Sequence, residues 1–350
     1  MVETIVPPRL DIENDAIFLL GELYLNYKLP QHELTLGRMK INSALINPQD
    51  GRMIPTLVQG ARYSYTSKKS GSISLGVFDQ IAPRSTGEFF NIGESIGTYP
   101  EGRNIDGNAH RYKDNTTSYF VVLLNSNVTI SKRISLDFSN LYVDNIANNA
   151  YVKPKYKIND KIDVEAEWLH QNRVGDGGNV LDSLRYFTSE SSDVLGLKLG
   201  YQKQTTKLSL AYNRILANGQ FISPREWGRE DLFSFQKRER SEGTGDSHAL
   251  VTHYDTRIHL DSDKIQLQSI LSVGRHWKPS VLDANMNKYA MPDYTQINLD
   301  LSFKFAKLEH FRPELLLVSK IGQGDIPDNP NFYLNKVDMF HVDLILNYNF

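Results

Sequence analysis

The chain has 350 residues, 39 Lys and Arg against 41 Asp and Glu, and no cysteine. The absence of cysteine excludes disulfides, thiol nucleophiles and thiolate metal sites. The net charge of -2 argues against a nucleic-acid partner, which would need a concentrated basic surface. No apolar run approaches the roughly 18 residues that a membrane-spanning helix needs.

From about residue 16 the chain consists of short segments in which apolar and polar residues alternate. Alternation at a period of two places apolar side chains on one face of a β-strand and polar side chains on the other. The segments 57–66 and 72–77 are joined by the short connection 68–71, which predicts a hairpin. Within 150–157, Pro154 cannot donate to a strand ladder and predicts a bulge. Further alternating segments are 19–27, 134–139, 150–157, 162–168, 195–201, 208–212, 250–260, 265–273 and 296–305.

The connections alternate between short turns and long loops, the longest being 83–115, 173–191 and 217–247. We count about fifteen candidate strands and no amphipathic helix. Short turns at one rim and long loops at the other are typical of a transmembrane β-barrel. We therefore expect an all-β fold, a single antiparallel transmembrane barrel domain over residues 1–350. A soluble β-sandwich or propeller is the alternative, although no repeat of blade length occurs.

The last fifteen residues form the clearest predicted strand. One face carries Phe340, Val342, Leu344, Leu346, Tyr348 and Phe350, and the other carries mainly polar residues. Such a strand needs an apolar medium on one side and water on the other. Tyrosines gather near other strand ends, as the aromatic girdles of membrane barrels require. An ordinary C-terminal strand of a soluble sheet is the alternative.

Two segments resemble the OprD family of bacterial outer-membrane porins. The first, Leu36 to Gly60 (LGRMKINSALINPQDGRMIPTLVQG), contains an Asp50-x-Arg52-apolar-apolar-Pro55 motif that leads into the next strand. The second, Arg225 to Asp246 (REWGREDLFSFQKRERSEGTGD), is similar to a long loop of the family. The terminal Phe350 also resembles the signal that barrel-assembly machinery reads. The resemblance covers the chain from about residue 15 to its end.

This resemblance implies a monomeric porin of the outer membrane, through which small hydrophilic solutes diffuse passively. Its expected partners are the lipid bilayer, lipopolysaccharide, small solutes and, through Phe350, the assembly machinery. Neither enzymatic activity nor a cofactor is expected. Barrels of the family have eighteen strands, so we expect N-terminal strands to be missing from this sequence or unrecognised within it. An open sheet would leave edges that a membrane does not tolerate.

The resemblance also implies a pore with a basic track for carboxylate-bearing nutrients. The polar residues of the alternating segments, together with the motif that begins at Asp50, are the candidates for lining this pore. Loop 83–115 is the candidate constriction, with Arg84, Arg103 and Arg111 available, and 217–247 is expected to be an external loop. The pore-lining candidates are Arg52, Arg62, Lys153, Lys155, Lys198, Arg257, Arg103 and Asp50.

Other functions stay open at this point. Acids accompany the bases, since Glu165 and Glu167 lie on the segment after Lys153 and Lys155, so a porin for neutral or sugar-like solutes is the first alternative. A soluble β-rich binding protein and an outer-membrane enzyme are the others, but no nucleophile elbow or zinc spacing is present. Asp176, Asp261 and Asp263 fit solvated turns better than calcium sites. The loop arginines are expected to be solvated or bound to lipopolysaccharide phosphates: Arg225, Arg229, Arg238 and Arg240.

Overall fold

A computed structural model describes residues 19–48, 54–99, 102–260, 264–324 and 337–348. Within these residues the chain is one antiparallel sheet with one short helix, α1 (Ile92–Ser95), and a single 3-10 turn at Arg225–Trp227. The strands are β1 (Leu23–Lys28), β2 (His32–Met39), β3 (Leu57–Ser67), β4 (Gly71–Ala82), β5 (Phe90–Asn91), β6 (Val121–Thr129), β7 (Ile134–Val143), β8 (Ala147–Lys157), β9 (Ile162–Arg173), β10 (Ser191–Lys203), β11 (Thr206–Ile215), β12 (Ser247–Leu260), β13 (Ile265–Trp277), β14 (Asp293–Phe305), β15 (Phe311–Gln323) and β16 (Met339–Tyr348).

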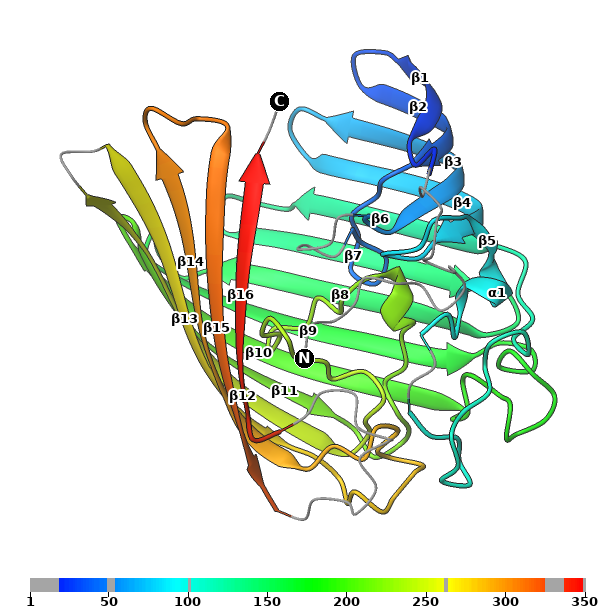
Figure 1. Cartoon of the computed structure of the whole chain (residues 1–350). Coiled ribbons are helices and arrows are strands. Elements are labelled where there is room, and N and C mark those ends of the chain that lie inside the picture. Colours follow the sequence, from blue (N-terminus) through cyan, green and yellow to red (C-terminus); the bar gives the residue numbers. More distant parts are fainter. Residues whose placement is uncertain (1–18, 49–53, 100–101, 261–263, 325–336, 349–350) are drawn as a thin grey trace, which may run out of the picture.

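Each strand of the wall pairs with its neighbour in sequence, and of the described strands only the short β5 lies off this path, beside β4. The fifteen strands of the wall confirm the count expected from the alternation. They curve around the long loops, as Figure 1 shows. Among the described residues β1 pairs only with β2, and β16 only with β15, so these two strands end the sheet.

The convex face of the sheet is apolar. On β10 the side chains of Leu195, Leu197 and Leu199 are 43%, 56% and 50% exposed, and on β16 Leu344 is 66% exposed. The alternate residues of β10 face the concave side, where Lys198 pairs with Glu165 of the neighbouring strand. The apolar side chains of the alternating segments therefore point outward, as the alternation predicts, and do not converge on a dry interior.

A packed core lies on the concave side, near the rim of the long loops. Phe78 and Val121 from the wall, Ile92 from α1 and Trp227 from the 3-10 turn are fully buried in one cluster. The Trp227 indole N–H donates to Ser95 Oγ at 2.8 Å. The long loops thus cover one another inside the curve of the sheet.

The local irregularities differ from the sequence-based expectation at Pro154. Pairing between β8 and β9 lapses at Lys153 and Pro154, but the register is the same on both sides, so the predicted bulge is wrong. Proline lacks the N–H that a ladder needs, and here the ladder loses pairs without gaining a residue. The bulge lies instead at Gln59 and Gly60. Gly60 has φ +154°, and a Cβ there would lie 2.1 Å from the Val77 carbonyl oxygen.

No helix within the described ranges is long and apolar enough to cross a bilayer.

Candidate functional site

The concave face carries acids and bases on adjacent strands. Glu165 on β9 lies in register with Lys155 on β8 and with Lys198 on β10. Its Oε1 is 3.0 Å from Lys155 Nζ and 3.1 Å from Lys198 Nζ, and Asp163 adds a further contact to Lys155 at 3.2 Å. Opposite charges on directly facing positions attract one another, so this row is held in place by its own pairs. All four side chains are partly exposed.

A segment of the loop between β11 and β12 crosses the concave face, and we call residues 231–239 the inner ledge. Its backbone is bound by polar side chains of the wall. The Phe233 N–H donates to Glu167 Oε1 at 2.8 Å, and the Ser234 N–H donates to Asn213 Oδ1 at 2.7 Å. Farther along, the carbonyl oxygen of Lys237 accepts from wall side chains, which are Gln296 and Asn298, at 2.8 Å each.

These bonds hold the inner ledge across the wall from β9 to β14, and the ledge itself contains two turns, in which the Phe235 N–H donates to the Leu232 carbonyl oxygen and the Glu239 N–H to the Gln236 carbonyl oxygen. Because backbone groups in a dry site need partners, the buried polar side chains of the wall determine where the ledge lies. Glu167 is only 3% exposed and also accepts from the Tyr151 hydroxyl and from Asn213 Nδ2. The chain at 217–247, expected to be an external loop, therefore contacts the inner wall along the ledge. Figure 1 shows its yellow-green trace within the curve of the sheet.

Burial alternates along the inner ledge. Leu232, Ser234 and Gln236 are almost fully buried against the wall. Asp231 is exposed, and Phe233, Phe235 and Lys237 are partly exposed. The two aromatic rings of the ledge are therefore partly exposed, and the Phe233 ring lies 4.5 Å from Lys198 Nζ of the wall.

Ion pairs hold the far end of the ledge. Arg238 binds the Asp343 carboxylate of β16 through Nη2 at 2.7 Å and Nε at 3.0 Å. Lys237 Nζ lies 2.5 Å from Asp300 Oδ2. Glu239 is buried, with its carboxylate 2.8 Å from Lys320 Nζ and 3.8 Å from Lys278 Nζ. Burial would raise the pKa of Glu239, but Lys320, His276 and Lys278 together outweigh burial and lower that pKa to about 2.

No family model and no curated protein sequence matches the chain. Solved structures do. OccAB2 of Acinetobacter baumannii has a TM-score of 0.68 at 13% identity, covering 92% of this chain and 75% of that one. OccD3 (OpdP) of Pseudomonas aeruginosa has a TM-score of 0.64 at 12% identity, covering 94% and 77%. OpdK of Pseudomonas aeruginosa, solved with vanillate, has a TM-score of 0.67 at 11% identity, covering 85% and 73%.

The chain has the fold of the OprD-type porins. This agrees with the family resemblance of the two motif segments and with the all-β barrel expected from the alternation. At these identities the likeness concerns the fold.

Within this OprD-type fold the candidate cations have different surroundings. Lys153 pairs with Asp231 of the ledge, and Lys155 and Lys198 share Glu165. Arg62 on β3 and Arg257 on β12 follow the concave parity, and neither forms an ion pair with a described residue. Asp50, Arg52 and the chain-terminal Phe350 lie outside the described residues, as do Asp261 and Asp263.

Arg103 is buried within the loop region. Its Nη2 donates to the carbonyl oxygens of Val281 at 2.8 Å and Asn287 at 2.7 Å, so it ties loop 83–115 to the loop between β13 and β14. Glu226 ties the same loop to 217–247, because its Oε1 accepts the Gly97 N–H at 2.8 Å. Loop 83–115 thus lies with the interior loops, and its role as a constriction stays a prediction.

The expectation that the loop arginines are solvated is wrong for Arg225 and Arg240, because each of them pairs with a buried acid. Arg225 Nε lies 2.8 Å from Glu242 Oε2, and Lys288 Nζ lies 3.2 Å from Oε1 of the same carboxylate. Arg240 pairs with buried Glu230 at 3.3 Å. Burial would raise the pKa of Glu242, but Lys288 and Arg225 outweigh it and hold that pKa below its ordinary value. Charges removed from water need such partners, which sequence spacing did not reveal.

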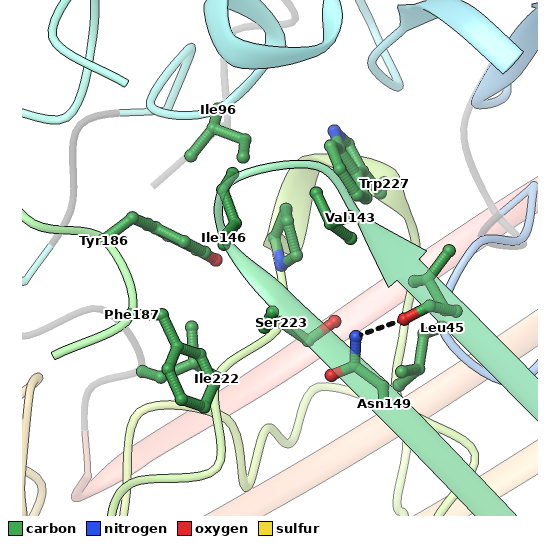
Figure 2. A pocket seen from close by; sticks show the side chains of 13 residues that line it. Leu45, Ile96, Val143, Ile146, Asn149, Tyr186, Phe187, Ile222, Ser223 and Trp227 are labelled. Atoms are coloured by element: carbon green, nitrogen blue, oxygen red, sulfur yellow. Dashed lines mark hydrogen bonds between the residues drawn. The ribbon is translucent and has the colours of Figure 1, made fainter. Parts of the chain in front are cut away.

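A small cavity lies among the packed loops. Figure 2 shows Ile96, Ile146, Tyr186, Phe187 and Trp227 around it. Its volume is about 20 Å³, which is enough for one water molecule and not for a nutrient. The cavity is a packing defect of the loop core. The described residues contain no group of three or more acids and histidines that could hold a metal ion.

The sequence analysis missed the inner ledge as a structural element. A short signal was present, because apolar and polar residues alternate from Phe233 to Gln236. The two Phe residues of this alternation are not on the buried side, which only the contacts with the wall establish.

Proposed function

We propose that this chain is a bacterial outer-membrane porin through which small hydrophilic solutes diffuse passively. The single observation that carries the proposal is the division of the sheet into an apolar convex face and a charged concave face, in an OprD-type fold. A bilayer outside and water inside satisfy both faces at once. The backbone of the interior strands is also satisfied, because each of them is paired on both sides, whereas β1 and β16 are each paired on one side among the described residues.

The height of the apolar surface supports a bilayer as its surroundings. On β12 the outward face begins at Leu250 and ends at Leu260, which are 40% and 41% exposed, and four of its six side chains are apolar or aromatic, Thr252 and Thr256 being the exceptions. Ten residues span roughly 33 Å of strand, at about 3.3 Å each. A tilt of about 40° reduces this to a band of about 25 Å, the height of the apolar belt of outer-membrane barrels.

The preferred solutes in this proposal carry a carboxylate. Arg62 and Arg257 support it, because no described acid pairs with either, and fixed cations along a pore wall draw anions through it. OpdK, one of the similar structures, was solved with vanillate. The second candidate is a porin for neutral or sugar-like solutes. It is favoured by the pairing of Lys155, Lys198 and Lys237 with acids.

Conductance and selectivity test the proposal. The folded chain, inserted in a planar bilayer, should conduct ions, and a salt gradient should give a reversal potential that indicates anion preference. Arg62→Gln and Arg257→Gln should each move this potential by several millivolts toward cation preference. Arg133→Gln changes an exposed residue in a turn and is the matched control. Absence of conductance contradicts the porin; unchanged selectivity in both variants contradicts the basic track.

The proposal extends to the partners of an outer-membrane porin. Lipopolysaccharide would contact the outer surface, the assembly machinery would bind the C-terminal strand through Phe350, and the protein would function as a monomer. Sedimentation in detergent tests the last point, and deletion of Phe350 should slow assembly in cells.

A further inference from the structure

We infer that the rim of the sheet at its short turns is a docking surface for anionic phospholipid headgroups in the adjoining leaflet. This surface, which we call the basic rim, extends along the adjacent hairpins from β3 to β11. Its cations are Lys68, Lys69, Lys132, Arg133, Lys161 and Lys203. The inference rests on the membrane location in the proposed function and adds a lipid partner on one side of the bilayer.

The basic rim has a large excess of positive charge. Its four connections are 68–70, 130–133, 158–161 and 204–205. Within two positions of these connections the sequence has eight Lys and Arg, including Lys157 and Lys207 of the concave face, and two acids. One of the acids, Asp163, already pairs with Lys155 at 3.2 Å, and the other is Asp160. The six cations of the rim are exposed, and none of them forms an ion pair with a described residue.

The connections at the opposite end of the same strands carry the opposite net charge. They are 83–120, 144–146, 174–190 and 216–246, and together they contain 10 Lys and Arg against 15 Asp and Glu. Charges of one sign that gather at one end of a molecule add up to a surface potential there. An anionic headgroup is therefore attracted to the short-turn end of the sheet and not to the long-loop end.

Backbone hydrogen bonds join the turns of the basic rim into a continuous row. The Lys157 N–H donates to the Arg133 carbonyl oxygen at 2.8 Å, and the Gln202 N–H donates to the Lys161 carbonyl oxygen at 2.8 Å. The first turn is bound to β6 in the same way, at 3.0 Å. Each turn is thus attached to the next hairpin, so the backbone positions of the cations are fixed before a lipid binds.

Apolar side chains of the rim lie beside its charges. Ile130 and Ile158, each in a turn, are 61% and 45% exposed, and the outward Tyr156 and Tyr201 are exposed as well. Isoleucine at a turn gains nothing from water, whereas tyrosine is enriched where acyl chains meet headgroups. Long Lys and Arg side chains can lay their stems along the acyl chains and place their charged ends at the level of the phosphates. The combination favours a headgroup that belongs to a membrane over a free anion or an acidic protein.

Lipid binding to the purified full chain tests the inference. The chain in dodecylmaltoside micelles is titrated with dioleoylphosphatidylglycerol and, separately, with dioleoylphosphatidylcholine, and native mass spectrometry counts the bound lipids. We expect the anionic lipid to bind at least about fivefold more tightly, which is the gain that one cation near an anionic surface supplies. Sodium chloride at about 0.5 M should reduce this preference, because salt screens exposed charges. Equal binding of the two lipids overturns the inference.

Substitutions in two separate turns locate the docking surface. The double variants Lys132→Gln with Arg133→Gln, and Lys68→Gln with Lys69→Gln, should each reduce the preference for the anionic lipid by about threefold or more. The exchange of Lys132→Arg with Arg133→Lys keeps both charges and should keep the preference, which separates charge from the fold of the turn.

Lys304→Gln is the matched control, because it removes an exposed lysine from the concave face of β14. Its lipid preference should equal that of the unmodified chain. If the two turn variants prefer the anionic lipid as strongly as the unmodified chain, or if the control loses as much preference as they do, the headgroups do not bind at the basic rim and the inference fails.

Two competitors distinguish a membrane lipid from other anions. Glycerol 3-phosphate carries the phosphate without acyl chains, and polyglutamate is an acidic polypeptide. Neither should displace phosphatidylglycerol when added at the same concentration of charge. Displacement by glycerol 3-phosphate identifies a site for free phosphate, and displacement by polyglutamate identifies a surface for an acidic protein; either result overturns lipid docking.

The outcomes for the basic rim and for the porin are separable. In a planar bilayer of phosphatidylcholine alone, the turn variants should conduct ions like the unmodified chain, because the substituted side chains are not on the concave face. A chain that conducts but does not prefer the anionic lipid overturns the basic rim and leaves the porin standing. A chain that prefers the anionic lipid but conducts no ions contradicts the porin and leaves the lipid-binding rim standing.

Discussion

Buried charged side chains hold the long loops in place inside the sheet. Glu239 of the ledge is enclosed with Lys320 from β15 and Lys278 from the following loop. A buried carboxylate without a cation would be protonated or would keep the loop in water. The pairs therefore stabilise one position of the loop, and removal of one partner leaves an uncompensated charge.

The stability of the protein should consequently fall in acid because of Glu239. Its folded pKa is about 2 and its ordinary value is 4.5, so its stabilising contribution is complete above pH 4.5 and is lost as the pH falls toward 2. The difference corresponds to at most about 3 kcal/mol. Urea unfolding in detergent at pH 7 and pH 3 should show a smaller loss for Glu239→Gln than for the unmodified chain. Glu94→Gln, at an exposed site, should behave like the unmodified chain; equal pH dependence of all three contradicts the assignment.

At the scale of elements, each strand of the wall has an apolar outward face and a polar inward face. On β16 the outward residues are Phe340, Val342 and Leu344, whereas Asp343 turns inward to Arg238. Neighbouring residues on one strand therefore tolerate different substitutions, because one faces the apolar side of the sheet and the next faces the polar side. Burial alternates along the inner ledge as well: every second side chain is buried against the wall, and the side chains between them are partly exposed.

A charge on the outward face should therefore impair insertion. Leu344→Lys places an ammonium group in the middle of the apolar band and should destabilise the folded protein in vesicles by about 2–4 kcal/mol. Asn347→Lys, on the opposite face of β16, is the matched control and should cost less than about 1 kcal/mol. Denaturant titration in lipid vesicles measures both. Equal effects of the two substitutions would show that the outward face does not meet lipid.

For the whole molecule, the large apolar convex face decides the solvent that the protein needs. Exposed apolar patches on soluble monomers rarely exceed a few hundred Å². Here the outward Leu, Ile, Val and Tyr side chains extend over the entire wall. The fold therefore belongs in a membrane or in detergent.

The intact protein should therefore show the detergent partition and the gel migration of a membrane barrel. It should partition into the detergent phase and should migrate faster on a gel without heating than after boiling, because the hydrogen-bonded β-structure resists the detergent until heated. A soluble β-rich binding protein would instead stay monodisperse without detergent. Phase partition and paired unheated and boiled gel lanes measure the difference.

Much of the fold was predictable from the sequence, because strand pairing here is between neighbours. The hairpin of β3 and β4 was predicted from 57–66, 72–77 and the four-residue connection, and the apolar parity of β10 correctly indicates the convex face. The failures concern contacts with distant residues. At Pro154 the register depends on the partner strand, and at Arg225 the solvent exposure depends on Glu242 in the folded loop.

The sequence by itself determined most strands of the wall and the face that their residues take, because alternation at period two is a local property of the chain. Only the tertiary structure decided which charges are paired and where the 217–247 loop lies. Arg238 and Asp343, which fix the end of the ledge, are 105 residues apart, and Ser234 and Asn213 meet only because the wall curves around the loop. No spacing in the sequence encodes such meetings, since they depend on how the whole sheet encloses its loops.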